Sequence, residues 1–103
     1  MKRVSIVNII QRTLHQLFPS AEVVLFGSEA RGDARQDSDI DLLVLFDKEH
    51  LSFDDKMSVI SSLEDISLSE NVEISPVIYT KKYWEQRPTD FFKRNIQNEG
   101  IRL

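Results

Sequence analysis

The chain has 103 residues, enough for one domain with a modest core, and its 13 basic and 17 acidic side chains give a net charge of −4. This balance argues against binding to nucleic acid through a general basic surface, and no apolar run approaches the roughly 20 residues of a membrane span. From its length we expect a single domain over residues 1–103. The sequence has no cysteine, which excludes disulfides and thiolate metal sites and agrees with a reducing cytoplasm.

The N-terminal segment is predicted to form an amphipathic helix over residues 4–18, because apolar residues recur there at helical spacing and Pro19 disfavours its continuation. The stripe expected to face the core consists of Val7, Ile10, Leu14, Leu17 and Phe18. The basic start of this segment faintly resembles a signal peptide. Polar residues interrupt the apolar run at helical spacing, however, so we interpret the segment as part of the mature fold.

Three strands are predicted, over residues 21–26, 40–47 and 72–79. The second is apolar on both faces beyond Asp41, so it should lie centrally in a sheet, beneath helices. The third contains Pro76, which cannot donate a hydrogen bond to a sheet ladder, and it should therefore lie at an edge or form a bulge.

Helices are expected between and after these strands. Ser52 should cap a helix that ends before a polar turn at residues 67–71. Residues 81–84 should lead into a loop around Pro88, and a last helix should follow at residues 89–98, ended by Gly100. The apolar contacts expected of the two helices are Met57, Ile60, Leu63 and Leu68 or Ile66 in the first, and Phe91, Phe92 and Ile96 in the second. The pattern predicts an α/β fold, with a small mixed sheet and helices packed on it.

Two aspartates open the second predicted strand. Strand side chains alternate between faces, so Asp39 and Asp41 should point the same way. Two carboxylates side by side repel each other and are costly to desolvate, and a divalent cation removes that repulsion. Oxygen ligands suit Mg²⁺ or Mn²⁺. The alternative is a capped turn at Ser38 and Asp39, which explains one of the carboxylates but hardly both.

A glycine and a serine follow the first predicted strand. Gly27 allows the backbone to approach a ligand closely, Ser28 adds a hydroxyl, and residues 29–31 can begin a short helix with free N–H groups. A phosphate site beside paired carboxylates is expected for metal-assisted phosphoryl or nucleotidyl transfer. An ordinary strand-to-helix turn is the alternative, and Arg31 can either pair with phosphate or brace the loop through Asp33 or Asp37.

The motifs Gly27-Ser28-x-Ala30-Arg31-Gly32 and Ser38-Asp39-Ile40-Asp41-Leu42-Leu43-Val44 together resemble the signature of the nucleotidyltransferase superfamily. They are most similar to minimal nucleotidyltransferase (MNT) domains of bacteria and archaea, and residues 94–101 resemble the tail of many such proteins.

The resemblance implies metal ligands at Asp39 and Asp41, and triphosphate binding at Gly27 and Ser28 with Arg31 beside them. The family usually has a third carboxylate, an Asp on a neighbouring strand, which completes the metal site and can accept a proton. The position that fits here is Glu73, which departs from the family by one methylene and is otherwise interpreted as a solvent-facing strand residue.

The implied reaction is transfer of a nucleoside monophosphate, AMP from ATP, with Mg²⁺ or Mn²⁺, to an acceptor hydroxyl. A chain this short has no further domain for a bulky substrate, so we expect the acceptor on a partner protein, with a hetero-oligomer as a consequence. MNT proteins of this size resemble antitoxins encoded beside HEPN-domain toxins, whose tyrosines they can adenylylate. Direct nucleic-acid or membrane binding is not expected. The alternatives are a small-molecule nucleotidyltransferase of the aminoglycoside-modifying kind and a non-catalytic binding module with a decayed site.

Overall fold

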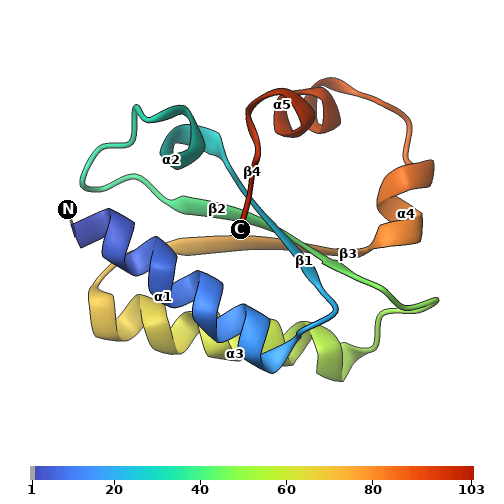
Figure 1. The fold of residues 1–103 in the computed structure, drawn as a ribbon, viewed down its shortest axis with the longest axis horizontal. Helices are drawn as coiled ribbons and strands as arrows, with labels where there is room; N and C mark the ends of the chain where they lie inside the picture. The colour runs from blue at the N-terminus through green and yellow to red at the C-terminus, as the bar shows by residue number, and fades with distance from the viewer. Residues whose placement is uncertain (1) are drawn as a thin grey trace.

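A four-stranded mixed sheet with the strand order β3-β2-β1-β4 forms the centre of the structure, a computed structural model that describes residues 2–103 (Figure 1). In chain order the elements are α1 (Lys2–Leu17), β1 (Glu22–Phe26), α2 (Gly27–Arg31), β2 (Ile40–Phe46), α3 (Phe53–Glu70), β3 (Ile74–Thr80), α4 (Lys81–Gln86), α5 (Phe91–Glu99) and β4 (Ile101–Arg102). β1 pairs antiparallel with β2 and β4, whereas β2 and β3 are parallel. The predicted α/β fold with a small mixed sheet is confirmed.

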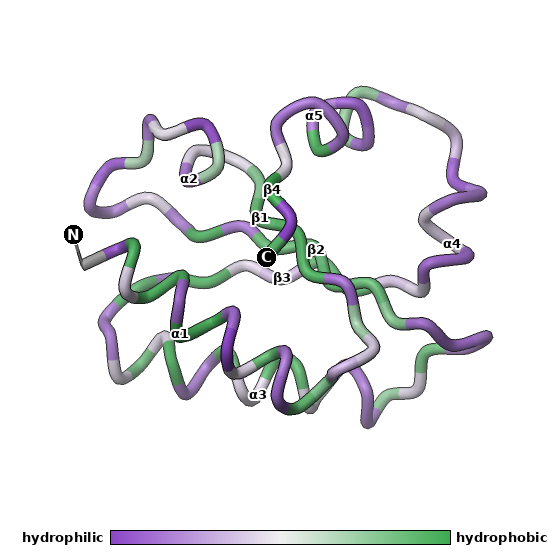
Figure 2. Tube along the Cα trace, in the orientation of Figure 1, coloured by the Kyte–Doolittle hydropathy of each residue, from purple (hydrophilic) through white to green (hydrophobic). Residues whose placement is uncertain are grey.

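β2 lies between β1 and β3 and is buried on both faces, as its continuous apolar run predicted. Ile40, Leu42 and Val44 face the cluster formed with α1 and α3, which lie side by side across one face of the sheet (Figure 1). Leu43 and Leu45 face the opposite cluster, with α4 and α5. Figure 2 shows hydrophobic residues along β1 and β2 and hydrophilic ones in the loop that leads from α2 to β2.

Of the two edge strands, β3 was predicted from the sequence and β4 was not. β3 lies at an edge of the sheet, as Pro76 predicted, with Pro76 opposite Leu42. β4 has two residues, and it pairs with Val24 and Leu25 of β1. A segment this short carries no periodicity of its own, so only the tertiary partner defines it as a strand.

The core face of α1 differs from the predicted stripe. Ile6, Ile10 and Leu14 are buried, whereas Leu17 is 55% exposed. These three residues form one row at spacings of four, which packs against α3 and the sheet. The prediction that Leu17 belongs to the core is wrong.

α3 begins as predicted, with a capping box between Ser52 and Asp55, but it continues through the expected turn to Glu70. Asn71 then ends it with a φ of 55°. The buried residues are Val59, Leu63 and Ile66, and the large exposed apolar residues are Phe53, Met57, Ile60 and Leu68, the last 76% exposed. The helix thus carries two apolar stripes, and the contact with α1 and the sheet buries the one that contains Leu63 and Ile66, which were predicted, and Val59, which was not.

The region after β3 is helical where a loop was expected. The Thr80 hydroxyl accepts a hydrogen bond from the Tyr83 N–H at 3.0 Å and caps α4, which buries Trp84 against the sheet. Thr80 is both the last residue of β3 and the cap of α4, so no polar turn separates the strand from the helix in the sequence. The start of α4 was missed for this reason.

α5 begins after Asp90, which accepts a hydrogen bond from the Lys93 N–H, and ends at Gly100 as predicted. Phe91, an expected core residue, is 79% exposed, and Lys93 is buried instead. The Lys93 ammonium donates to the carbonyl oxygens of Glu85 and Arg87, at 3.3 and 2.7 Å, so its burial leaves the charge hydrogen-bonded. No helix within residues 2–103 has the length and apolar character needed to cross a membrane.

Candidate active site

The antiparallel pairing of β1 with β2 brings the glycine-serine half and the aspartate half of the motif together. Phe26, the last residue of β1, pairs with Asp41, so Gly27 lies directly against that carboxylate. A Cβ added at Gly27 would be 2.3 Å from Asp41 Oδ2, and the φ of Gly27 is +73°. The glycine therefore permits both the backbone turn into α2 and the close approach of Asp41.

Asp41 is partly buried and Asp39 is exposed at the head of β2. Burial raises the pKa of Asp41, and the negative charge of Asp39 raises it further, while Arg31 acts in the opposite direction. The ionised pair is thus electrostatically unfavourable by itself. Paired carboxylate oxygens fit Mg²⁺ or Mn²⁺, and Mg²⁺ commonly uses one or two carboxylates together with substrate phosphates and water.

Ser75 is a site residue that sequence reasoning missed. The parallel pairing of β2 with β3 places it opposite Asp41, and its hydroxyl donates a hydrogen bond to Asp39 Oδ2 at 3.2 Å. Its position two residues after Glu73, as a polar side chain in an otherwise apolar strand, was the available signal.

Glu73 lies just before β3. Its backbone carbonyl accepts a hydrogen bond from the Ile40 N–H at 2.9 Å, which sets it level with Asp39 at the head of the two strands. Its side chain is exposed and lines a cavity of about 260 Å³ with Ser38 and Ser67. Among residues 2–103, no three His, Cys, Asp or Glu side chains converge as a metal-binding group. Glu73 is therefore near Asp39 in the sheet, but it does not form a three-carboxylate cluster.

α2 begins at Gly27 itself, one residue before Ser28, the serine that is expected to bind phosphate. Two carboxylates contact Arg31 in the described chain: Glu99 Oε2 at 3.0 Å and Asp33 Oδ2 at 3.3 Å. The bracing contact with Asp33 was one of the alternatives, and the second partner is Glu99 rather than Asp37. Glu99 also accepts a hydrogen bond from the Gly27 N–H at 3.2 Å. Glu99 was not predicted as a site residue, because a residue so far along the chain gives no local signal.

These features define an α/β domain with paired carboxylates beside a glycine-serine helix start, and comparison with known proteins identifies its family. A model of the nucleotidyltransferase domain matches residues 7–103. Two provisionally assigned protein adenylyltransferases of Methanocaldococcus jannaschii are similar to the chain. One is 44% identical over 81 residues, 79% of this chain and 76% of the relative, and the other is 33% identical over 79 residues, 77% and 73% of the two chains. The chain therefore belongs to the nucleotidyltransferase domain family.

Solved structures agree with this assignment. A provisionally assigned minimal nucleotidyltransferase superimposes with a TM-score of 0.69 at 27% identity, covering 100% of this chain and 97% of that one. A toxin-antitoxin crystallised with AMP-PNP superimposes with a TM-score of 0.65 at 21% identity, covering 92% and 69% of the two chains. At that identity the second similarity shows the fold alone. The predicted resemblance to minimal nucleotidyltransferases is confirmed.

Proposed function

We propose that this chain is a metal-dependent nucleotidyltransferase that transfers AMP from ATP to a hydroxyl group of a partner protein. The observation that supports this most directly is the contact between Asp41 and Gly27, with Asp39 close enough to raise the pKa of Asp41. A cation site next to a phosphate site is the arrangement that this reaction would require, and the close approach of Asp41 to Gly27 supports it. The similarity to protein adenylyltransferases supports a protein as the acceptor.

In this proposal Asp39 and Asp41 hold Mg²⁺ or Mn²⁺. A bound cation would offset the charge of both carboxylates and of the phosphates. Gly27 allows the triphosphate to approach the backbone closely, Ser28 binds it through its hydroxyl and N–H, and Arg31 contributes positive charge beside them. Ser75 orients Asp39 through its hydrogen bond.

The transfer forms a bond between the acceptor oxygen and the α-phosphorus while the bond from that phosphorus to the pyrophosphate oxygen breaks. Pyrophosphate leaves toward Gly27 and Ser28. The proton of the acceptor hydroxyl passes to a carboxylate base, for which we propose Glu73, because it stands at the head of β3 beside Asp39 and its side chain is accessible.

We further propose that the partner is a HEPN-domain toxin and that the chain is its antitoxin. Two considerations support this proposal: the MNT resemblance of the motifs, and the presence of toxin-antitoxin structures among the folds that superimpose on the chain. Adenylylation of a toxin tyrosine would neutralise the toxin covalently, and a complex of the two proteins would be the reacting species.

The test is incubation of the chain with Mg²⁺, α-labelled ATP and the protein encoded by the adjacent reading frame. We expect label on the partner, and loss of that label in Asp41→Asn. Asp65→Asn, at an exposed position of α3, is the matched control and should label normally. Undiminished labelling by Asp41→Asn would refute the proposal.

A non-catalytic antitoxin is the second candidate, and the lack of a three-carboxylate group among residues 2–103 favours it. Such a protein would neutralise its partner by covering it. Neutralisation by Asp39→Asn without any label on the partner would support this candidate, whereas loss of neutralisation together with the label would support the enzyme.

A further inference from the structure

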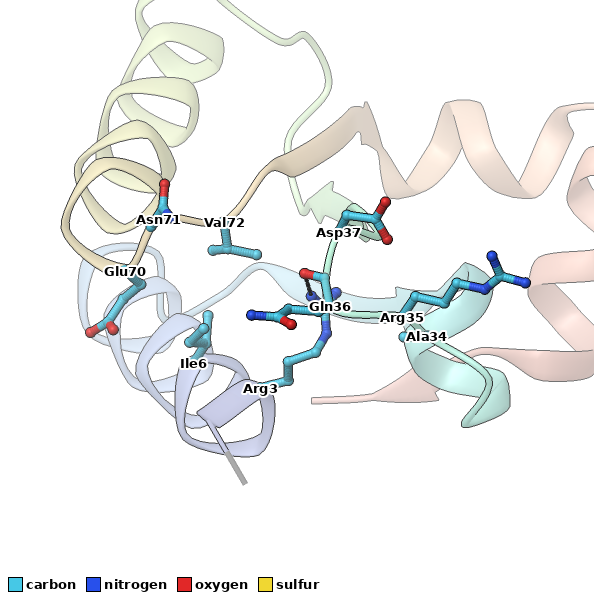
Figure 3. Close-up of a pocket in the computed structure, with 9 residues that line it drawn as sticks. All are labelled: Arg3, Ile6, Ala34, Arg35, Gln36, Asp37, Glu70, Asn71 and Val72. Atoms are coloured by element: carbon cyan, nitrogen blue, oxygen red, sulfur yellow. Dashed lines mark hydrogen bonds between the residues drawn. The ribbon is translucent and has the colours of Figure 1, made fainter.

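The loop that joins α2 to β2 connects the candidate phosphate site to the candidate cation site. Its residues 33 and 35–37 are exposed. Behind it lies an open cleft of about 880 Å³, bounded by the start of α1, by the loop and by the residues that follow α3 (Figure 3). This side of the loop therefore rests on few packed side chains, and hydrogen bonds must determine its position.

Arg3, in the first turn of α1, spans the edge of this cleft toward the loop (Figure 3). Its guanidinium makes three hydrogen bonds: Nε to Glu29 Oε1 at 2.5 Å, Nη1 to the Gln36 carbonyl oxygen at 3.1 Å and Nη2 to the Ser38 carbonyl oxygen at 2.7 Å. The Arg3 and Glu29 side chains are only 12% and 15% exposed, so this pair is shielded from solvent far more than an ordinary surface ion pair.

The acceptors of Arg3 belong to both halves of the motif. Glu29 lies on α2, next to Ser28, and Ser38 directly precedes Asp39. One side chain from α1 therefore fixes the helix that carries the phosphate motif relative to the backbone that carries the first aspartate. At the far end of the loop the Ser75 hydroxyl holds the Asp39 side chain, whereas contacts such as the Arg35 N–H to Ser38 Oγ hydrogen bond at 2.9 Å are local.

We propose that Arg3 is a positioning residue of the nucleotidyl-transfer site, an inference that rests on the function proposed above. Arg3 holds the spacing between α2 and Asp39 without itself contacting the reactants. A guanidinium is suited to this because its rigid planar fork serves three acceptors at once, whereas a lysine ammonium on a flexible stem can pair with Glu29 but cannot match the fork.

The experiment compares Arg3→Met, Arg3→Lys and the matched control Arg12→Met, which alters an exposed arginine of the same helix. Two properties are measured well below the melting temperature: amide hydrogen exchange of residues 33–41 in the cation-free protein, and Mn²⁺ affinity from water-proton relaxation. We expect Arg3→Met to exchange faster in this segment and to bind Mn²⁺ about tenfold more weakly. Arg3→Lys should be intermediate, and Arg12→Met should match the wild type.

Other outcomes separate the explanations. Unchanged hydrogen exchange together with unchanged Mn²⁺ affinity in Arg3→Met would overturn the proposal. A lower melting temperature or faster exchange with unchanged Mn²⁺ affinity would also overturn it, because a merely structural role predicts those results. If Arg3→Met does not fold, the comparison of Arg3→Lys with the wild type decides in the same way. Failure of the wild type to bind Mn²⁺ would refute the proposed function, while the exchange rates would still show whether Arg3 fixes the loop.

Discussion

Alanine at Gly27 should damage both stability and the site, and Gly32 offers a matched control. Both glycines have positive φ, +73° and +82°, but an added Cβ would meet Asp41 Oδ2 at 2.3 Å in the first case and nothing within 4 Å in the second. The left-handed backbone costs a non-glycine residue roughly 1–2 kcal/mol at either position. At Gly27 the carboxylate must also retreat by about 1 Å to reach ordinary contact distance.

Forcing atoms into an occupied space costs about 1–3 kcal/mol, so Gly27→Ala should lower the free energy of unfolding by that amount more than Gly32→Ala does. Urea denaturation of the two variants measures the difference directly. In the double variant Gly27→Ala/Asp41→Ala the steric conflict is gone, and the excess destabilisation should disappear with it. If Gly27→Ala proves no less stable than Gly32→Ala, the close packing of Asp41 on Gly27 is refuted.

Three further changes test other features. Asp41→Asn should raise the melting temperature of the cation-free protein at neutral pH, because burial and the adjacent carboxylate disfavour the ionised form. The gain should shrink as pH falls through the raised pKa of Asp41, because the wild-type carboxyl then becomes protonated. Thermal denaturation over this pH range measures the gain, and a difference in melting temperature that stays constant with pH would contradict the prediction. Glu99→Gln should reduce stability by less than about 1 kcal/mol in urea denaturation, since its ion pair with Arg31 is partly solvated, and a loss several times larger would show a buried role. Leu63→Ala should cost about 2–5 kcal/mol and Leu68→Ala less than about 0.5 kcal/mol, and equal losses would refute the observed face of α3.

The three longer strands and the positions of the two aspartates were predictable because their signals are local. The uninterrupted apolar run of β2 placed it at the centre of the sheet, and Pro76 placed β3 at an edge. The alternation of side chains along a strand requires no knowledge of the partner strands, so Asp39 and Asp41 could be assigned to one face from spacing alone.

The errors share a different physical origin. α3 has two apolar stripes, and only its packing against α1 and the sheet determines which one is buried. Likewise Lys93 is buried because carbonyl oxygens of Glu85 and Arg87 happen to receive its ammonium, a contact between segments that no periodicity records. Ser75 and Glu99 reach the site through strand pairing and through the return of the chain after α5.

The hydrogen bonds that surround α2 also have a consequence for folding. They join residues separated in sequence by 26 and 35 positions through Arg3, and by 68 and 72 positions through Glu99. Contacts that close such long loops require most of the chain to be ordered first, so they form late. Partly folded chains, including nascent ones, should therefore lack an ordered candidate site even after the sheet has begun to assemble. The site would form only once both α1, which carries Arg3, and α5, which carries Glu99, have packed against the rest of the fold.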